Sequence, residues 1–236
     1  MRTPKDSRES PRRGRILPVA LGALLLGSFW GAAEARGEEP DLTPVREWIA
    51  RQARLKSLEG SFLQERRLRT VRRPLVREGR FWFVAPDRMR WQVGKEGEAE
   101  LIAVRTEGGV LVLRPQKKEL ERHSPRDLEE DDRLRGLGFL RAGFPRNADA
   151  FLRDFSVASV QRDGEYWVVE ASLNDREARL ALRKLVFFIE QDRYRLGALR
   201  LYFRDGSEIH TRFTSLHADV EVDAALFRPD LSGYSE

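Results

Sequence analysis

The stretch that decides the fold, residues 78–93, reads E-G-R-F-W-F-V-A-P-D-R-M-R-W-Q-V. From residue 88 to 93 polar and apolar residues alternate strictly, which is typical of a strand with one wet face and one dry face. The preceding run, 81–85, is apolar at both parities, and Pro86-Asp87 breaks the chain between the two runs. We therefore expect two neighbouring strands that are rich in aromatic residues.

The dry face of these two strands carries Phe81, Phe83, Met89 and Trp91. An apolar surface of this size must be buried in a core or offered to an apolar ligand. Because aromatic stripes on strands usually pack in cores, a permanently filled core is the plainer alternative to a ligand-binding face.

More strands are expected on both sides of this stretch. Upstream, Thr43-Pro44 begins an amphipathic helix over 44–56, with Trp48 on its dry side. Turns such as Asp163-Gly164 and Asp205-Gly206 separate the strands that follow. The expected strands are 60–68, 76–84, 88–93, 98–105, 110–113, 117–122, 155–161, 166–171, 179–190, 195–204, 208–216 and 220–227.

The series of strands is interrupted once, by a helical insert over 124–154. Ser124-Pro125 is a helix start, and Asn147 caps a short helix over 148–155. The strands on both sides predict an α+β fold that is mainly antiparallel β. Since a sheet of about ten strands is too long to stay flat, we expect a curved unclosed β-barrel, or half-barrel, with helices covering the concave face.

Residues 1–35 have the three parts of a secretory signal peptide. Arg12, Arg13 and Arg15 precede an apolar run over 16–30, and Ala33-Glu34-Ala35 offers a cleavage site. The apolar run is shorter than the roughly 20 residues that a membrane-spanning helix requires. We therefore expect a cleaved leader over 1–35, a single domain over 36–236 and a periplasmic location, with an uncleaved N-terminal anchor as the alternative.

The composition argues against several classes of function. The 236 residues carry a net charge of +5 and no cysteine, which leaves no disulfide framework and no thiol nucleophile. The histidines, His123, His210 and His217, have no metal-ligand spacing, and no Ser-His-Asp order is supported by turn chemistry. Arginines beside aromatics over 66–82 are a pattern that binds single-stranded nucleic acid, but an export leader argues against that partner. We expect no enzyme, no metal and no cofactor.

Several motifs, taken in order, resemble the LolA family of periplasmic outer-membrane lipoprotein carriers. The resemblance begins with Phe62-Leu63-Gln64 and with E-G-x-F-W-F-x-x-P at 78–86, followed by Trp91. It continues through the turn Glu107-Gly108-Gly109 and the hairpin Asp205-Gly206, and it ends in D-A-A-L-F-R-P at 223–229. The matching order covers most of the mature chain.

The resemblance implies a monomeric carrier without covalent chemistry. Its cavity takes lipoprotein acyl chains from an inner-membrane ABC exporter complex and passes them to an outer-membrane acceptor. The residues expected to line this cavity are Phe81, Phe83, Met89, Trp91, Leu111, Leu199, Leu201 and Phe203. The residues expected on the underside of a lid are Leu137, Phe139 and Leu140, with glycine hinges at Gly136, Gly138 and Gly143.

One position departs from the family pattern. Many members carry an arginine directly before the motif proline, where this chain has Ala85, and Arg88 and Arg90 are the nearest basic substitutes. The departure keeps two alternatives open. One is a carrier for a glycolipid or another lipid, and the other is a periplasmic sensor that binds a lipidated ligand and a membrane partner.

Overall fold

The computed structural model of the protein describes residues 39–95, 97–124, 144–176 and 178–235. All of these residues belong to one compact unit, Glu39–Glu236. The expected signal peptide and the expected lid residues Leu137, Phe139 and Leu140 lie outside the described residues.

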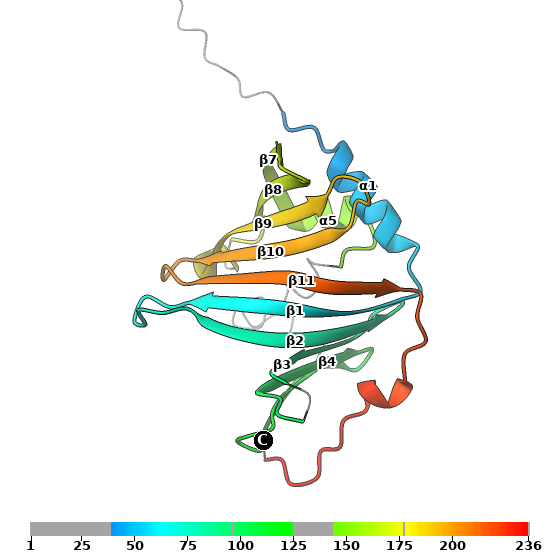
Figure 1. The fold of residues 1–236 in the computed structure, drawn as a ribbon, viewed down its shortest axis with the longest axis vertical. Coiled ribbons are helices and arrows are strands. Elements are labelled where there is room, and N and C mark those ends of the chain that lie inside the picture. Colours follow the sequence, from blue (N-terminus) through cyan, green and yellow to red (C-terminus); the bar gives the residue numbers. More distant parts are fainter. Residues whose placement is uncertain (1–38, 96, 125–143, 177, 236) are drawn as a thin grey trace, which may run out of the picture. The chain divides into compact units, whose positions relative to one another are not determined.

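The described residues form one antiparallel sheet of 11 strands, in the order β6-β5-β4-β3-β2-β1-β11-β10-β9-β8-β7 (Figure 1). Consecutive strands pair within β1 to β6 and within β7 to β11, and the pairing of β1 with β11 joins these two halves of the sheet. The strands are β1 (Ser57–Arg67), β2 (Leu75–Val84), β3 (Arg88–Val93), β4 (Leu101–Thr106), β5 (Gly109–Arg114), β6 (Glu119–His123), β7 (Phe155–Asp163), β8 (Tyr166–Leu173), β9 (Leu182–Glu190), β10 (Leu196–Phe203) and β11 (Glu208–Ala218).

The sheet is curved and does not close into a barrel, because its terminal strands β6 and β7 do not pair with each other. Helices α1 (Thr43–Ala53) and α5 (Ala148–Asp154) cover one end of the concave face, above β8 to β10 (Figure 1). The expected half-barrel with helices on its concave face is confirmed.

Three groups of buried apolar residues hold the sheet and its covers together. The helix-covered core joins α1 and α5 to the sheet and consists of Val45, Trp48, Ile49, Phe151, Phe155, Val169, Ala171, Leu182, Leu185, Phe187, Ile189, Leu196, Leu199 and Leu201. The aromatic cluster lies farther along the same face and consists of Leu58, Phe62, Phe81, Phe83, Met89, Trp91 and Ala103. The tail-covered core lies on the opposite face and consists of Trp82, Ala99, Ile102, Val104, Leu113, Leu120 and Phe227.

The segment over 220–227, expected to be a final strand, is part of a tail that packs over the convex face. It contains the 3₁₀ helix η2 (Ala224–Phe227), which begins where the Asp223 carboxylate accepts a hydrogen bond from the Ala225 N–H, 2.8 Å away. The strand expected over 179–190 likewise begins only at Leu182, because the short helix α6 (Ala178–Ala181) precedes it. The final strand was therefore a wrong expectation and the other strand was expected to begin too early, because local apolar content does not distinguish a strand from a helical turn that buries the same residues.

Candidate functional site

Glycines in two strands allow large aromatic rings to lie flat on the concave face of the sheet. A Cβ atom on Gly79 would collide with the ring of Phe62, and one on Gly60 would come within 2.8 Å of the ring of Phe81. The Phe62 ring in turn stacks on Trp91, with ring centroids 4.0 Å apart. The result is a flat apolar surface on the aromatic cluster, which we call the aromatic floor. Only 1% of Phe62 and 4% of Trp91 is exposed there.

The ring of Phe144 packs against the aromatic floor. Its ring centroid lies 5.0 Å from that of Phe81, 6.3 Å from that of Phe83 and 6.1 Å from that of Phe213. Phe144 itself is half-buried and contributes to the walls of two separate pockets. Phe144 is therefore the residue that both pockets share.

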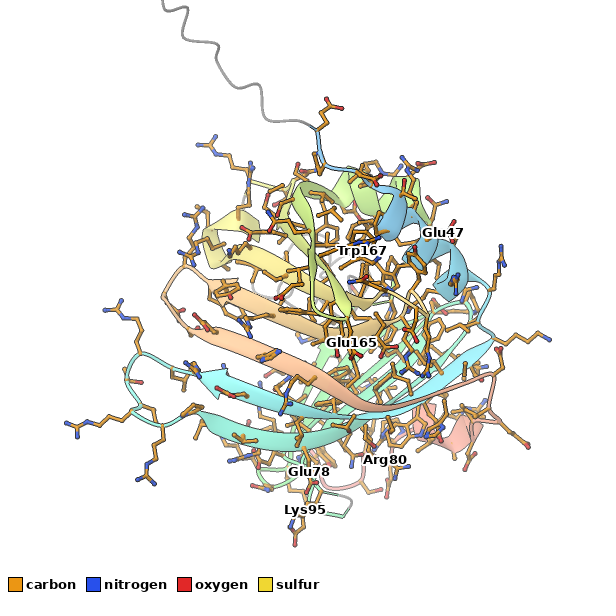
Figure 2. The ribbon with its side chains drawn as sticks, turned by 45° about the horizontal axis from the view of Figure 1, so that its top comes forward. Glu47, Glu78, Arg80, Lys95, Glu165 and Trp167 are labelled. Atoms are coloured by element: carbon orange, nitrogen blue, oxygen red, sulfur yellow. The ribbon has the colours of Figure 1, made fainter. Side chains whose placement is uncertain are left out.

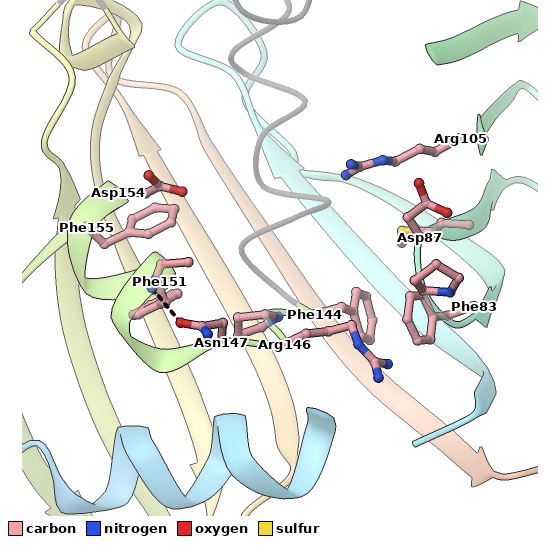
Figure 3. Close-up of a pocket in the computed structure, with 13 residues that line it drawn as sticks. Phe83, Asp87, Arg105, Phe144, Arg146, Asn147, Phe151, Asp154 and Phe155 are labelled. Carbon is pink, nitrogen blue, oxygen red and sulfur yellow. Dashed lines mark hydrogen bonds between the residues drawn. The ribbon is translucent and has the colours of Figure 1, made fainter. Parts of the chain in front are cut away.

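The first pocket, which we call the α5 pocket, has a volume of about 250 Å³ (Figure 3). One wall comes from β2 to β4 and the opposite wall from α5 and the start of β7, so the curvature of the sheet brings distant strands to the same cavity. Its lining residues are Phe83, Pro86, Asp87, Met89, Arg105, Phe144, Pro145, Arg146, Asn147, Ala150, Phe151, Asp154 and Phe155.

The second pocket, which we call the α1 pocket, has a volume of about 180 Å³ and lies between the end of α1 and the turn from β9 to β10. Its apolar wall comes from leucines of β1, β10 and β11, together with Phe144 and Phe213. Its lining residues are Arg51, Gln52, Leu55, Leu58, Phe144, Arg193, Tyr194, Arg195, Leu196, Phe213, Leu216 and Ala218.

Gln52, in the last turn of α1, leaves a buried hydrogen-bond donor beside the α1 pocket. Its Oε1 accepts a hydrogen bond from the indole N–H of Trp48 at 3.1 Å, and since that indole can only donate, the orientation of the amide is fixed. The Nε2 of Gln52 therefore points elsewhere, and it is buried without a hydrogen-bond partner. An unsatisfied buried donor costs about 1–3 kcal/mol, so an acceptor on a ligand would relieve a real penalty here.

Within the part of the chain that the structure describes, the charged residues that line the α1 pocket are all arginines. Arg195 forms a bidentate salt bridge with Glu190, in which Nε and Nη2 donate to the two carboxylate oxygens at 2.8 and 2.9 Å. The guanidinium of Arg51 lies 4.8 Å from the centre of the Tyr194 ring and 3.9 Å from Glu47. The acidic partners do not line the pocket, so the lining itself presents positive groups above an apolar wall.

The α5 pocket contains charges of both signs. Asp87 lies beside Arg105 on the sheet side, and Asp154 faces them from α5 (Figure 3). One carboxylate oxygen of Asp87, Oδ1, is buried without a hydrogen-bond partner. Asn147, at the base of the pocket, is committed to the fold, because its Oδ1 accepts a hydrogen bond from the Ala150 N–H at 2.8 Å and caps α5.

Arg146 ties the segment that carries Phe144 to the end of α1. Its guanidinium donates hydrogen bonds to the Leu55 carbonyl at 3.0 Å and to the Ala53 carbonyl at 2.6 Å. The same group lies 5.8 Å from the centre of the Phe83 ring. Because helix C-termini carry free carbonyls and a partial negative charge, a cation is well placed there. Arg146 thereby fixes where Phe144 enters the concave face.

The structure brings together half of the residues expected in the cavity. Phe81, Phe83, Met89 and Trp91 all belong to the aromatic cluster, and Phe83 and Met89 also line the α5 pocket. Phe81 and Trp91 lie beneath Phe144 and Phe213 as part of the floor.

The other four expected residues lie apart from both pocket linings. Leu199, Leu201 and Phe203 are on the concave face but pack in or against the helix-covered core, beneath α1 and α5. Leu111 is on the opposite face of the sheet, where it pairs with Val104 and packs against the tail-covered core. Its strand is apolar at both parities, so the alternation that identifies the inner face of β3 gives no orientation here.

The basic residues nearest to Ala85 are not at the cavity. Arg88 lies over the ring of Phe227 at 5.4 Å, and Arg90 donates a hydrogen bond to the Leu226 carbonyl at 3.0 Å. Both therefore hold the tail on the convex face. Desolvation by this burial lowers the pKa of Arg90. The basic residue that reaches the aromatic floor is Arg146, which sequence reasoning missed because it lies far along the chain from that motif.

No helix among the described residues is long and apolar enough to cross a membrane. The same part of the chain contains no group of three or more His, Asp or Glu residues placed to hold a metal ion.

No protein-family model and no curated protein matches the sequence. Among solved structures, the chain is similar to an uncharacterized conserved protein from Thermus thermophilus, with 10% identity, a TM-score of 0.48 and coverage of 80% of this chain and 96% of that one. It is also similar to a LolA superfamily protein from Nitrosomonas europaea, with 10% identity, a TM-score of 0.39 and coverage of 77% and 96%.

A third similar structure is the MucA/MucB complex of Pseudomonas aeruginosa, with 13% identity, a TM-score of 0.42 and coverage of 78% of this chain. This chain spans 60% of the matched chain in that complex. A LolA superfamily protein is thus among the structural neighbours, as the sequence resemblance led us to expect. A likeness at these TM-scores does not extend to function, which has to be inferred from the site itself.

Proposed function

We propose that the domain over 36–236 is a periplasmic carrier, exported by a leader over 1–35, that shields the acyl chains of lipoproteins. In this proposal the carrier takes its cargo from an inner-membrane ABC exporter complex, releases it to an outer-membrane acceptor, works as a monomer and catalyses no reaction. The observation that carries the proposal is the pair of apolar-walled pockets that meet at Phe144 on the concave face.

The energetics favour acyl chains as the occupants of these pockets. Each CH₂ group moved out of water gains about 0.8 kcal/mol, so every part of an acyl chain that a pocket accepts contributes to binding. The aromatic floor beneath Phe144 is apolar and already formed, so binding does not require the core to be rebuilt. A preformed apolar pocket with a few polar groups is typical of small-ligand sites.

The polar groups of the α1 pocket favour a second candidate, a carrier for another amphiphilic lipid. Arg51, Arg193 and Arg195 offer positive charge, and Gln52 offers a free amide donor. These groups suit a head group with acceptor oxygens, such as a glycolipid, as well as the glyceryl esters of a lipoprotein. Both candidates place the acyl chains against the same apolar wall.

Variants that fill each pocket with a large side chain test whether the pockets bind a lipid or are only gaps in a packed core. Ala150→Trp places an indole in the α5 pocket, and Ala218→Trp places one in the α1 pocket. We expect each variant to bind a dansyl-labelled fatty acid about tenfold more weakly than wild type, a loss of about 1.4 kcal/mol. The matched control is Ala158→Trp, because Ala158 is an exposed residue of β7 outside both pocket linings.

The cargo is then tested by lipoprotein release. Mature protein is added to spheroplasts that hold a radiolabelled lipoprotein in the inner membrane, and the soluble fraction is counted. We expect wild type and the Ala158→Trp control to release the lipoprotein and both pocket variants to release little. Fatty-acid binding without lipoprotein release would favour the second candidate, a carrier for another amphiphilic lipid such as a glycolipid. Absence of both would contradict a carrier and favour a sensor that binds a membrane partner.

A further inference from the structure

The hairpin that joins β1 to β2 has a surface that the carrier role does not explain. We call residues 66–77 the basic hairpin. This segment contains no acidic residue, and its arginines are Arg66, Arg67, Arg69, Arg72, Arg73 and Arg77. Side chains from this hairpin stand away from the rest of the fold (Figure 2). Its tip is therefore strongly positive and open to solvent.

The same hairpin exposes apolar side chains. The described residues contain four exposed large apolar residues, and three of them, Val71, Leu75 and Val76, lie here, with exposed fractions of 43%, 38% and 55%. Three exposed large apolar residues in one short segment are uncommon on a globular domain and usually mark a contact surface. Because one short segment exposes both apolar residues and arginines, we expect it to contact a binding partner that is both apolar and anionic.

The register of the sheet makes this hairpin project past the end of β3, on one side of the hairpin. The pairing of β1 with β2 continues to Arg66 and Leu75, whereas the pairing of β2 with β3 ends at Gly79 and Val93. The last residues of β1 and the first of β2 therefore extend past the end of β3 (Figure 1). Both pockets lie toward the other end of these strands, near Leu58 and Phe83. The basic hairpin is thus separate from the proposed cavity.

Most of its positive charge is not neutralised within the fold. Arg67 pairs with Glu65 at 2.8 Å, and Arg77 pairs with Glu100. Among the described residues, Arg66, Arg69, Arg72 and Arg73 form no ion pair. Two acids lie close by on the next hairpin. Glu208 is paired in register with Arg67, and Asp205 has a pKa that is lowered mainly by hydrogen bonds from Ser207 and further by Arg69 and Arg66.

We propose that the basic hairpin docks the protein on an anionic lipid bilayer, with its arginines on head-group phosphates and Val71, Leu75 and Val76 at the acyl boundary. A guanidinium group can donate two parallel hydrogen bonds to the oxygens of one phosphate. The alkyl part of the arginine side chain can lie in apolar surroundings. An amphipathic surface element with cations around a small apolar tip is suited to the interface of a membrane. An acidic protein surface would match the charge but would leave the three apolar side chains without an apolar partner.

Vesicle binding tests this proposal with the full mature domain. The protein is sedimented with vesicles of phosphatidylglycerol and phosphatidylethanolamine, and separately with vesicles of phosphatidylcholine alone. We expect binding only to the anionic vesicles, weakening as salt is raised from low to physiological concentration. Equal binding to both kinds of vesicle, or none to either, would overturn the proposal. Binding to polyglutamate without binding to vesicles would also overturn it and would point to an acidic protein.

Two hairpin variants and one control locate the contact. We expect Arg69→Gln/Arg72→Gln/Arg73→Gln to reduce partition onto anionic vesicles about tenfold. We expect Val71→Ser/Val76→Ser to weaken partition onto anionic vesicles severalfold. The binding that remains should be more sensitive to salt than that of wild type. The control Arg54→Gln/Arg153→Gln/Arg176→Gln removes the same charge from exposed positions outside the hairpin and should bind like wild type. Equal losses in control and charge variant would show a general charge effect and refute the site.

These variants also keep the docking surface distinct from the cargo site. All five substituted hairpin positions are exposed, and none lines either pocket, so fatty-acid binding should be unchanged in the hairpin variants. Loss of vesicle binding with intact fatty-acid binding would support the docking surface whether or not the carrier proposal holds. If both were lost, the variants would have damaged the fold. The conservative charge variant Arg69→Lys/Arg72→Lys/Arg73→Lys, which keeps the charge, should then rescue both.

Discussion

At the scale of single residues, His210 shows how burial makes the fold sensitive to acid. The Nδ1 of its ring lies 3.4 Å from Nη2 of Arg200, and the centroid of its ring lies 6.1 Å from that of Phe188. Desolvation lowers the pKa of His210 from its ordinary 6.5, and Arg200 and Arg212 lower it further, while Glu65 opposes them. Arg67 adds to the lowering. The fold therefore favours the neutral imidazole.

The sign of the stability change follows from that shift. Above pH 6.5 the ring is neutral in both the folded and the unfolded state, so it contributes no pH dependence. As the pH falls below 6.5, the unfolded chain takes up the proton first, and the free energy of unfolding falls. We expect His210→Gln to lose less stability than wild type between pH 7 and pH 5, measured by urea unfolding. His217→Gln, at an exposed position near the end of β11, is the control. Parallel pH curves for wild type and His210→Gln would contradict this account.

At the scale of elements, Arg146 joins two segments that are far apart in sequence, the end of α1 and the approach to α5. Each of its hydrogen bonds reaches a carbonyl at the C-terminal end of α1. Hydrogen bonds made by charged groups contribute about 1.5–3 kcal/mol each, partly offset here by solvent access. We expect Arg146→Met to lower the free energy of unfolding by about 2 kcal/mol in urea titrations. Arg153→Met, at an exposed position of α5, should change it by less than about 0.5 kcal/mol. A change in Arg146→Met as small as in this control would show that the contact does not stabilise the fold.

Elements with alternating sequence were the ones that the sequence predicted best. The inner face of β3 followed from the alternation over 88–93, and Met89 and Trp91 lie in the aromatic cluster with Phe81 and Phe83 of β2, as expected. For β5, which is apolar at both parities, the sequence does not identify the inner face, and Leu111, which was expected in the cavity, packs against the tail-covered core instead. The tail segment η2 was mistaken for a strand because Phe227 is as buried as a strand residue would be.

At the scale of the whole sheet, the half-barrel was predictable and the pockets were not. Strand number and the order of hairpins were enough to predict a curved, open sheet. The pockets depend on where Phe144, Pro145 and Arg146 cross the concave face, which is fixed by tertiary contacts with α1 and the aromatic floor. Gln52, Arg193 and Arg195 were missed for the same reason, since nothing in their local sequence marks them as neighbours of one cavity.

The central claim is that the concave face holds the acyl chains of a cargo, and native mass spectrometry of the mature protein tests it most directly. The protein is purified without detergent from the periplasm of a Gram-negative cell, and its mass is compared with that of Ala150→Trp/Ala218→Trp. We predict that wild type carries a bound mass that lipid extraction identifies as acylated protein or lipid and that the double variant lacks. A wild-type protein that is empty, and that takes up no fluorescent fatty acid, would contradict the carrier account and show that the aromatic floor is only a core.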